Sequence, residues 1–197
     1  MIDFTSLLPE EDEQKRLQNT FKPVANQVTK DSNYSSESSD WLWNQQPLDV
    51  VPDKHKTFVY LITNKITGKR YIGFKVFVTK KQRIINHKKK RFDFESDWRD
   101  YWSSSDNLNN DVKKYGPGNF IREVVCLTVN KSIGKYIEAQ LHFDRKVLTI
   151  NKDNYYNGIV NLRINQQTLK QIDDVEWCTK PLLGDILAKE QFGIVDL

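Results

Sequence analysis

The sequence predicts an α/β (α+β) fold in which a small, mostly antiparallel three-stranded sheet is flanked by helices. Within Phe58–Gly73, two short runs of β-branched and aromatic residues flank a polar turn that contains Gly68, which is typical of a β-hairpin. Farther along, Phe120–Leu127 is rich in β-forming residues and supplies the third strand. Ser132–Leu148 places apolar residues at helical spacing and is the clearest helix in the chain.

Each arm of the predicted hairpin carries one tyrosine. Tyr60 lies in the first apolar run and Tyr71 in the second, so pairing of the two arms brings both phenols close together. The segment that follows the hairpin is strongly basic. Two paired phenols beside a basic segment indicate phosphate chemistry.

Charge is strongly segregated along a chain whose net charge is only +4. Residues 1–53 hold ten Asp and Glu against four Lys and Arg, whereas residues 54–92 hold 13 Lys and Arg and no acidic residue. A basic segment this dense attracts polyanions, although the alternative of an ordinary solvated surface stays open. The acidic N-terminal residues are candidates for binding a protein partner or for covering the basic face.

The composition divides the chain into three parts. Residues 1–53 form an acidic tail that is predicted to be largely disordered, because Asp31–Asp40 is Ser-rich and nearly devoid of apolar residues. Residues 54–165 form the folded domain, and residues 166–197 form a C-terminal extension that packs on it. Trp41-Leu42-Trp43 is the apolar exception within the tail, and it docks either on the domain or on a partner; docking on the domain is favoured.

Helical patterns follow the hairpin. Residues 79–91 are predicted to form a first helix, on which Arg83 and His87 share one face because they are four residues apart. A second helix carries Leu108, Val112 and Tyr115 and ends at Gly116.

The long helix and the C-terminal third complete the predicted elements. Ser132 is a candidate cap for the long helix, and one helix face carries its core residues, Ile133, Ile137, Leu141 and Leu148. Residues 159–164 are a candidate short strand, and residues 182–187 suggest a small amphipathic helix that packs on the core.

Several classes of protein are excluded by composition. No apolar run approaches the roughly 20 residues that a membrane-spanning helix needs. The N-terminus has neither the basic nor the apolar region of a secretory signal, which predicts a cytoplasmic protein. Cys126 and Cys178 are the only cysteines and lack CxxC spacing, so neither a zinc site nor a disulfide framework is expected.

From about Thr57 to Asn161 the chain resembles the GIY-YIG endonuclease family. Tyr71-Ile72-Gly73 matches the second half of the signature, and Phe58-Val59-Tyr60 stands at the first half, with its tyrosine but without its glycine. The further matches are Arg83 and His87 as Arg-x-x-x-His, Tyr115-Gly116 with Asn119-Phe120 and Glu123, Glu138 on the long helix, and Tyr156-Asn157. The segments 98–105 and 155–161 are most similar to nucleases of large tailed phages, for which the compartment would be the host cytoplasm.

The resemblance implies a site for hydrolysis of phosphodiester bonds. Glu138 would hold one Mg²⁺ or Mn²⁺, because hard cations prefer carboxylate oxygens and water. Arg83 would pair with the scissile phosphate, and His87 would donate a proton to it or help to deprotonate a water. Tyr60 would act as general base, with its pKa lowered by Lys69 or Arg83, or would orient the attacking water. Tyr71 would bind the same water or phosphate, and Asn157 would play a supporting role.

DNA is the expected substrate and partner, and no membrane is expected. Basic residues of the hairpin and of the predicted first helix would bind phosphates without reading sequence. They are Lys69, Arg70, Lys75, Lys80, Lys81, Lys88, Lys89, Lys90 and Arg91.

The resemblance therefore implies a metal-dependent DNA endonuclease, of a homing or DNA-degrading kind. The alternative is a non-catalytic DNA-binding or assembly module derived from such a nuclease. Phe58 in place of the family's glycine favours the alternative, whereas the presence of Tyr60, Tyr71, Arg83 and Glu138 together favours the enzyme.

Overall fold

The computed structural model describes residues 40–85 and 88–196. Residues 1–39, which make up most of the predicted acidic tail, lie outside the described residues, as do Asn86, His87 and Leu197. Among the helices of the described ranges, none has the length and apolar character required to cross a bilayer.

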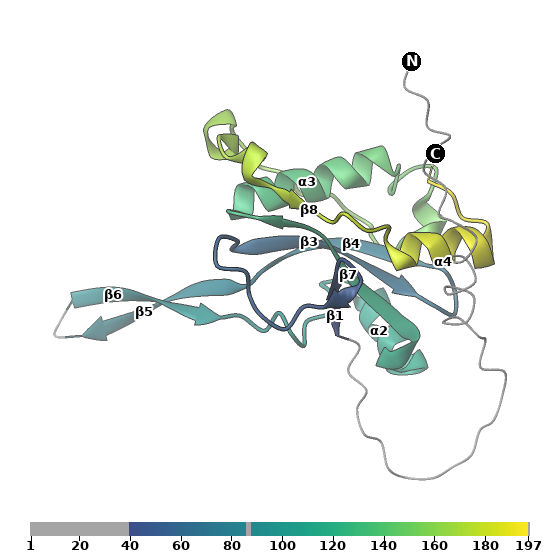
Figure 1. Cartoon of the computed structure of the whole chain (residues 1–197), viewed down its shortest axis with the longest axis horizontal. Helices are drawn as coiled ribbons and strands as arrows, with labels where there is room; N and C mark the ends of the chain where they lie inside the picture. Colours follow the sequence, from purple (N-terminus) through teal and green to yellow (C-terminus); the bar gives the residue numbers. More distant parts are fainter. Residues whose placement is uncertain (1–39, 86–87, 197) are drawn as a thin grey trace, which may run out of the picture. The chain divides into compact units, whose positions relative to one another are not determined.

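The chain folds into a larger and a smaller β-sheet with helices packed on the larger one (Figure 1). The strands are β1 (Trp41–Trp43), β2 (Gln46–Pro47), β3 (Thr57–Asn64), β4 (Arg70–Val76), β5 (Val78–Ile85), β6 (Lys88–Glu95), β7 (Phe120–Thr128) and β8 (Glu176–Trp177). The α-helices of the described residues are α2 (Asp106–Tyr115), α3 (Lys131–Asp144) and α4 (Leu183–Phe192). Single-turn 3₁₀ helices span Pro117–Asn119, Lys152–Asn154, Gln166–Leu169 and Ile172–Asp174.

The larger sheet has six strands and mixed direction, so the prediction of a small, three-stranded, mostly antiparallel sheet was wrong in size. Its order is β2-β1-β7-β3-β4, and β8 also pairs with β7. The predicted core of this sheet is present, because β3 pairs antiparallel with both β4 and β7. The additional strands join the far side of β7, where β1 is parallel and β8 antiparallel.

Trp41 explains why the folded unit begins before the predicted boundary. Its side chain is buried, its ring packs edge-on against Phe58 and Tyr60, and its indole Nε1 donates a hydrogen bond to the Trp98 carbonyl, 2.7 Å away. Burial of a large aromatic side chain and pairing with β7 together hold residues 41–43 on the domain, rather than in a tail.

Buried residues form two clusters, one on each face of the sheet. Strand alternation sends Phe58, Tyr60 and Ile62 to the face that α2 covers, and Val59 and Leu61 to the face that α3 covers. Helix α4 packs against β3 and β7, and its Gly184 lies against Thr63, on the same face as α3. Figure 1 shows this layering of α3 and α4 on one side of the sheet and α2 on the other.

Helix α2 follows the prediction, and α3 departs from it at both ends. Ile133 and Ile137 are buried as predicted, but Asn130 rather than Ser132 caps the helix, because its side chain accepts from the backbone N–H groups of residues 132 and 133. The helix ends at Asp144, so Leu148 falls outside it and is exposed. Residues 159–164, all described, contain no strand, and Ile159 is exposed.

The predicted helix over residues 79–91 is wrong. Strands β5 and β6 form an antiparallel two-stranded sheet there, in register from Val78 opposite Glu95 to Ile85 opposite Lys88. Thr79, Ile84 and the two phenylalanines of β6 favour the extended backbone.

Ion pairs and hydrogen bonds of charged side chains connect the C-terminal residues to the domain. Arg70 is buried and donates to Asp185 and Asp196, each at 2.9 Å, while Arg145 pairs with the same Asp185 at 2.8 Å. At the start of α4, the Glu123 carboxylate accepts hydrogen bonds from the backbone N–H groups of Leu183 (2.6 Å) and Gly184 (2.8 Å). These contacts place α4 over β3 and β7.

Candidate active site

A cavity of about 540 Å³ lies beside β4, the strand at one edge of the larger sheet. Tyr71 enters it from β4, and Glu138 and His142 enter it from α3. Ser104 and Asn157 line it from the segments that precede α2 and follow residue 155. The cavity therefore collects side chains from three separate regions, including three of the residues that the sequence indicated.

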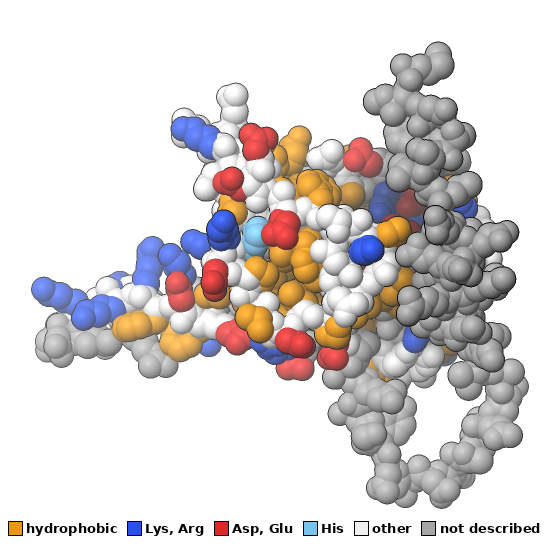
Figure 2. Space-filling view, viewed as in Figure 1, with side chains coloured by type: hydrophobic (Ala, Val, Ile, Leu, Met, Phe, Trp, Pro, Cys, Tyr) orange, Lys and Arg blue, Asp and Glu red, His pale blue; other side chains and the backbone are white. Residues whose placement is uncertain are grey.

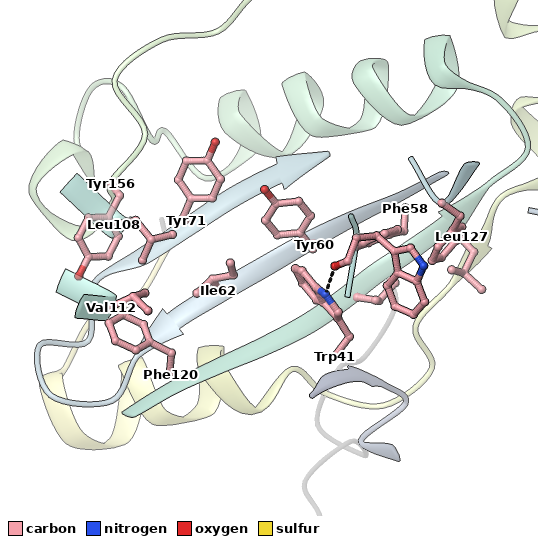
Figure 3. Packing of buried hydrophobic residues seen from close by; sticks show 13 residues of the cluster. Trp41, Phe58, Tyr60, Ile62, Tyr71, Leu108, Val112, Phe120, Leu127 and Tyr156 are labelled. Carbon is pink, nitrogen blue, oxygen red and sulfur yellow. Dashed lines mark hydrogen bonds between the residues drawn. The ribbon is translucent and has the colours of Figure 1, made fainter. Parts of the chain in front are cut away.

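Tyr60 and Tyr71 come together as the hairpin predicts. Their ring centroids are 6.1 Å apart, and Figure 3 shows the Tyr60 side chain pointing from β3 toward β4. Gly73 lies opposite Tyr60 in the β3–β4 register, and a Cβ at this position would collide with the Tyr60 ring and with Tyr71. A β-bulge between Val59 and Tyr60 shifts the pairing with β7 at this point.

Burial sets the chemistry of both phenols. It raises the pKa of Tyr60 well above its ordinary value, and Tyr71, Tyr101 and Glu138 raise it further. It also raises the pKa of Tyr71, against a hydrogen bond of 3.2 Å to the Ser104 hydroxyl. The predicted lowering of the Tyr60 pKa by neighbouring cations is therefore wrong, and Tyr60 remains a protonated hydrogen-bonding group.

Phe58, which stands where the family signature has glycine, lies in the core rather than at the cavity. Its ring is fully buried and packs against Phe77 at 4.6 Å and Trp41 at 5.2 Å between centroids. Trp98 completes this aromatic cluster, with its ring edge-on to those of Phe58 and Phe77. Partners far from β3 in the sequence thus accommodate the larger side chain.

Glu138 is half-buried on α3, and its carboxyl group faces the cavity. Desolvation by burial raises its pKa to about 7, and the positive charge of Lys135, one turn earlier, acts in the opposite direction. A carboxyl group with this pKa is partly protonated at neutral pH, so a cation bound there would displace a proton.

Asn157 holds the edge strand rather than pointing free into the cavity. Its side-chain amide donates to the carbonyl of Ile72 at 2.7 Å and accepts from the N–H of Ile72 at 2.9 Å. The adjacent Tyr156 N–H donates to the Arg70 carbonyl at 2.8 Å. Residues 156–157 thus satisfy backbone groups on the open side of β4 and fix the strand that carries Tyr71.

Arg83 and His87 are the remaining predicted catalytic residues, and the structure describes only the first of them. Arg83 belongs to β5, opposite Lys90, and His87 lies outside the described residues. Arg83 therefore does not lie on the predicted helix, because residues 79–85 and 88–91 adopt extended structure instead.

The predicted DNA-binding residues fall into two groups. The prediction that Arg70 binds DNA is wrong, because its guanidinium is buried and paired with two aspartates. Lys69 lies over the Tyr156 ring at 5.3 Å, and Lys75 pairs with Asp97 at 2.7 Å. The remaining six are exposed on the β5–β6 ribbon: Lys80, Lys81, Lys88, Lys89, Lys90 and Arg91.

Three further residues at this site were not among those that the sequence predicted. The Ser104 hydroxyl is hydrogen-bonded to Tyr71, and Tyr101 is one of the groups that raise the pKa of Tyr60. His142 is buried one turn after Glu138, and its Nε2 lies 3.4 Å from the Ile72 carbonyl. Burial lowers the pKa of His142, so its imidazole is neutral at pH 7. Its spacing of four residues from Glu138 was the available signal.

The oxygen atoms that line the cavity suit a hard divalent cation that retains most of its coordinated water molecules. Within residues 40–85 and 88–196, no cluster of three or more His, Cys, Asp or Glu side chains could enclose a metal ion. Two carboxyl groups line the cavity, those of Glu138 and Asp106, and Glu138 would be the ligand that the family motif indicates, with hydroxyl oxygens of Tyr71 and Ser104 nearby. Mg²⁺ is commonly held by one or two carboxylates together with substrate phosphates, so the residues fit it.

Comparison with known proteins gives one family match. Residues 41–160 match the family model described as "Putative endonuclease segE, GIY-YIG domain". The matched range begins at the first residue of β1 and ends among the residues that line the cavity. No curated protein and no solved structure gives a significant match.

Proposed function

Because this chain belongs to the GIY-YIG endonuclease family, we propose that it hydrolyses phosphodiester bonds of DNA in the cavity beside β4, with the help of a divalent cation. The observation that carries the proposal is the convergence of Glu138 and Tyr71 on one cavity, with Tyr60 packed behind Tyr71. The cation would neutralise charge on the phosphate and lower the pKa of a bound water.

The two tyrosines serve as hydrogen-bond donors in this proposal. Their raised pKa values keep both phenols protonated, so Tyr71 can donate to a phosphate oxygen or orient a water at the cavity. Tyr60 lies behind it, almost fully buried, and holds Tyr71 and Tyr101 in place. Asn157 fixes the backbone between Tyr71 and Gly73 and acts as a positioning residue.

Nicking of a supercoiled plasmid by the full chain tests the proposal. We expect cleavage with Mg²⁺ or Mn²⁺ and none with a chelator. Glu138→Gln should lower the rate roughly 100-fold or more, while DNA affinity stays close to that of the wild type. Glu190→Gln is the matched control, because Glu190 is an exposed carboxyl group on α4. Undiminished cleavage by Glu138→Gln would remove Glu138 from the site.

A non-catalytic DNA-binding module is the second candidate. The observation that favours it is the extended structure of residues 78–85, which replaces the helix expected to carry Arg83 and His87. Wild-type protein that binds DNA but cuts neither supercoiled nor branched substrates with Mg²⁺ or Mn²⁺ would support this candidate over the nuclease.

A further inference from the structure

The β5–β6 ribbon is built without a core. Its two strands pair only with each other in the sheet topology, and nearly all described side chains from Lys80 to Asp93 are exposed. Val78 packs against the core at the base of the ribbon, but beyond that base neither face is covered. A two-stranded ribbon by itself is marginally stable in water. Two exposed faces of this kind suit a partner that surrounds the ribbon.

The charge of the ribbon specifies the kind of partner. The two strands carry seven Lys and Arg against two acidic residues, Asp93 and Glu95, which lie at the end of β6 away from the turn. Figure 2 shows the basic side chains gathered along this ribbon. A polyanion is the complementary ligand.

The cross-strand register separates two chemically different faces. Paired residues share a face, so Gln82 and Arg91 lie side by side on one of them. Lys81 and Phe92 share the other, where the Lys81 amine also lies 5.3 Å from the centre of the Phe94 ring. The first face thus carries the planar groups of Gln82 and Arg91 at its middle, between Lys80 with Asp93 on one side and Lys89 on the other. The second face carries Lys81, Lys88 and Lys90 together with the aromatic rings.

Double-stranded DNA matches these dimensions and groups. Its major groove is about 12 Å wide and admits a two-stranded β-ribbon. Strands of eight residues extend roughly 27 Å at about 3.4 Å per residue, which is enough to cross the groove. In that groove, Arg pairs with O6 and N7 of guanine, and Gln pairs with N6 and N7 of adenine.

We propose that the β5–β6 ribbon enters the major groove of duplex DNA and that Gln82 and Arg91 read adjacent base pairs. Lys81, Lys88 and Lys90 on the opposite face hold phosphates of the groove walls. The ribbon would thereby select the sequences that are presented to the cavity, and this inference rests on the proposed function for its DNA substrate.

The test measures sequence preference without cleavage. Full-length Glu138→Gln protein is incubated with a pool of duplexes randomised at about 15 positions, and the bound fraction is sequenced. We expect an enriched motif of a few base pairs that contains guanine. Arg91→Lys keeps the charge but loses the planar fork, so it should reduce discrimination at one base pair by about 5- to 150-fold with little change in non-specific affinity.

Lys88→Ala with Lys90→Ala is the matched control. It should weaken binding to all sequences alike and reduce the slope of log affinity against log salt by about 2, leaving the enriched motif unchanged. Methylation of guanine N7, which lies in the major groove, should block binding at the motif.

Three results would overturn the proposal: no enriched motif, a motif that Arg91→Lys and Gln82→Ala leave unchanged, or binding that is insensitive to N7 methylation. Unchanged thermal unfolding of each exposed-site variant shows that the ribbon change is local. If the wild-type chain cleaves DNA but shows no motif, the groove proposal fails and the nuclease proposal stands. If a motif is found but nothing is cleaved, the reverse holds.

Discussion

The side-chain amide of Asn157 pairs with both backbone polar groups of Ile72, and so it acts as a further strand residue beside β4. Asn157→Ala removes both hydrogen bonds, so the N–H of the buried Ile72 loses its partner and the Ile72 carbonyl keeps only the 3.4 Å contact with His142. We expect a loss of about 1–3 kcal/mol in the free energy of unfolding, measured by urea denaturation, and slower cleavage through misplacement of Tyr71. Asn161→Ala, at an exposed position of the same cavity, is the control; equal unfolding midpoints for both variants would contradict this role.

Gly73 lacks a side chain, and this allows the Tyr60 ring to lie directly against its backbone. In Gly73→Ala the new Cβ meets the Tyr60 ring and Tyr71 Cε1, so both tyrosines must move. We expect overpacking to cost about 1–3 kcal/mol in the free energy of unfolding and to reduce plasmid cleavage at temperatures where the protein is folded. Gly118→Ala is the matched control, because nothing lies within 4 Å of its added Cβ. Full cleavage by Gly73→Ala would show that the tyrosine positions do not matter for activity.

The elements that the sequence predicted correctly are those that bury apolar side chains. Strands β3 and β7 are buried along their whole length and are rich in β-branched and aromatic residues, whereas α2 and α3 bury apolar residues at helical spacing; both patterns are visible in the sequence. The β5–β6 ribbon is exposed beyond its base, so apolar alternation is confined to Phe92 and Phe94 near the end of β6, and its Lys, Arg and Gln residues are also good helix formers. Its pairing is visible only in three dimensions.

The candidate site was predictable where a family motif marked it and not elsewhere. Tyr71, Glu138 and Asn157 carry motif positions and converge on the cavity. Ser104 and Tyr101 reach the tyrosines from a loop whose path depends on long-range packing of Trp98 against Phe77. No local pattern encodes that path. Arg70 was assigned to DNA because its partners, Asp185 and Asp196, lie more than a hundred residues away.

Arg70 links β4 to the C-terminal residues through buried ion pairs, and its removal should therefore affect stability rather than DNA binding. Arg70→Ala leaves the partly buried carboxylates of Asp185 and Asp196 without one of their cations. We expect a loss of about 3 kcal/mol in the free energy of unfolding. Lys80→Ala, at an exposed site, should change this free energy by less than about 0.5 kcal/mol but should weaken DNA binding. Weaker DNA binding by a folded Arg70→Ala protein with an unchanged unfolding midpoint would restore the original prediction.

Glu123 makes the stability of the fold depend on pH. Burial raises its pKa from an ordinary value of about 4.5 to about 7, although its carboxylate accepts two hydrogen bonds at the start of α4. Because the folded state holds this proton more tightly than the unfolded chain, the contribution is fully present below about pH 4.5 and is lost as pH rises through 7. The loss is at most about 3 kcal/mol, since one pKa unit corresponds to about 1.4 kcal/mol.

Urea unfolding midpoints measured between pH 5 and 8 test this prediction. The midpoint should fall less steeply with pH for Glu123→Gln than for the wild type. Glu190→Gln, on the exposed side of α4, should follow the wild-type curve. Parallel curves for wild type and Glu123→Gln would mean that this carboxyl group is ionised throughout the range.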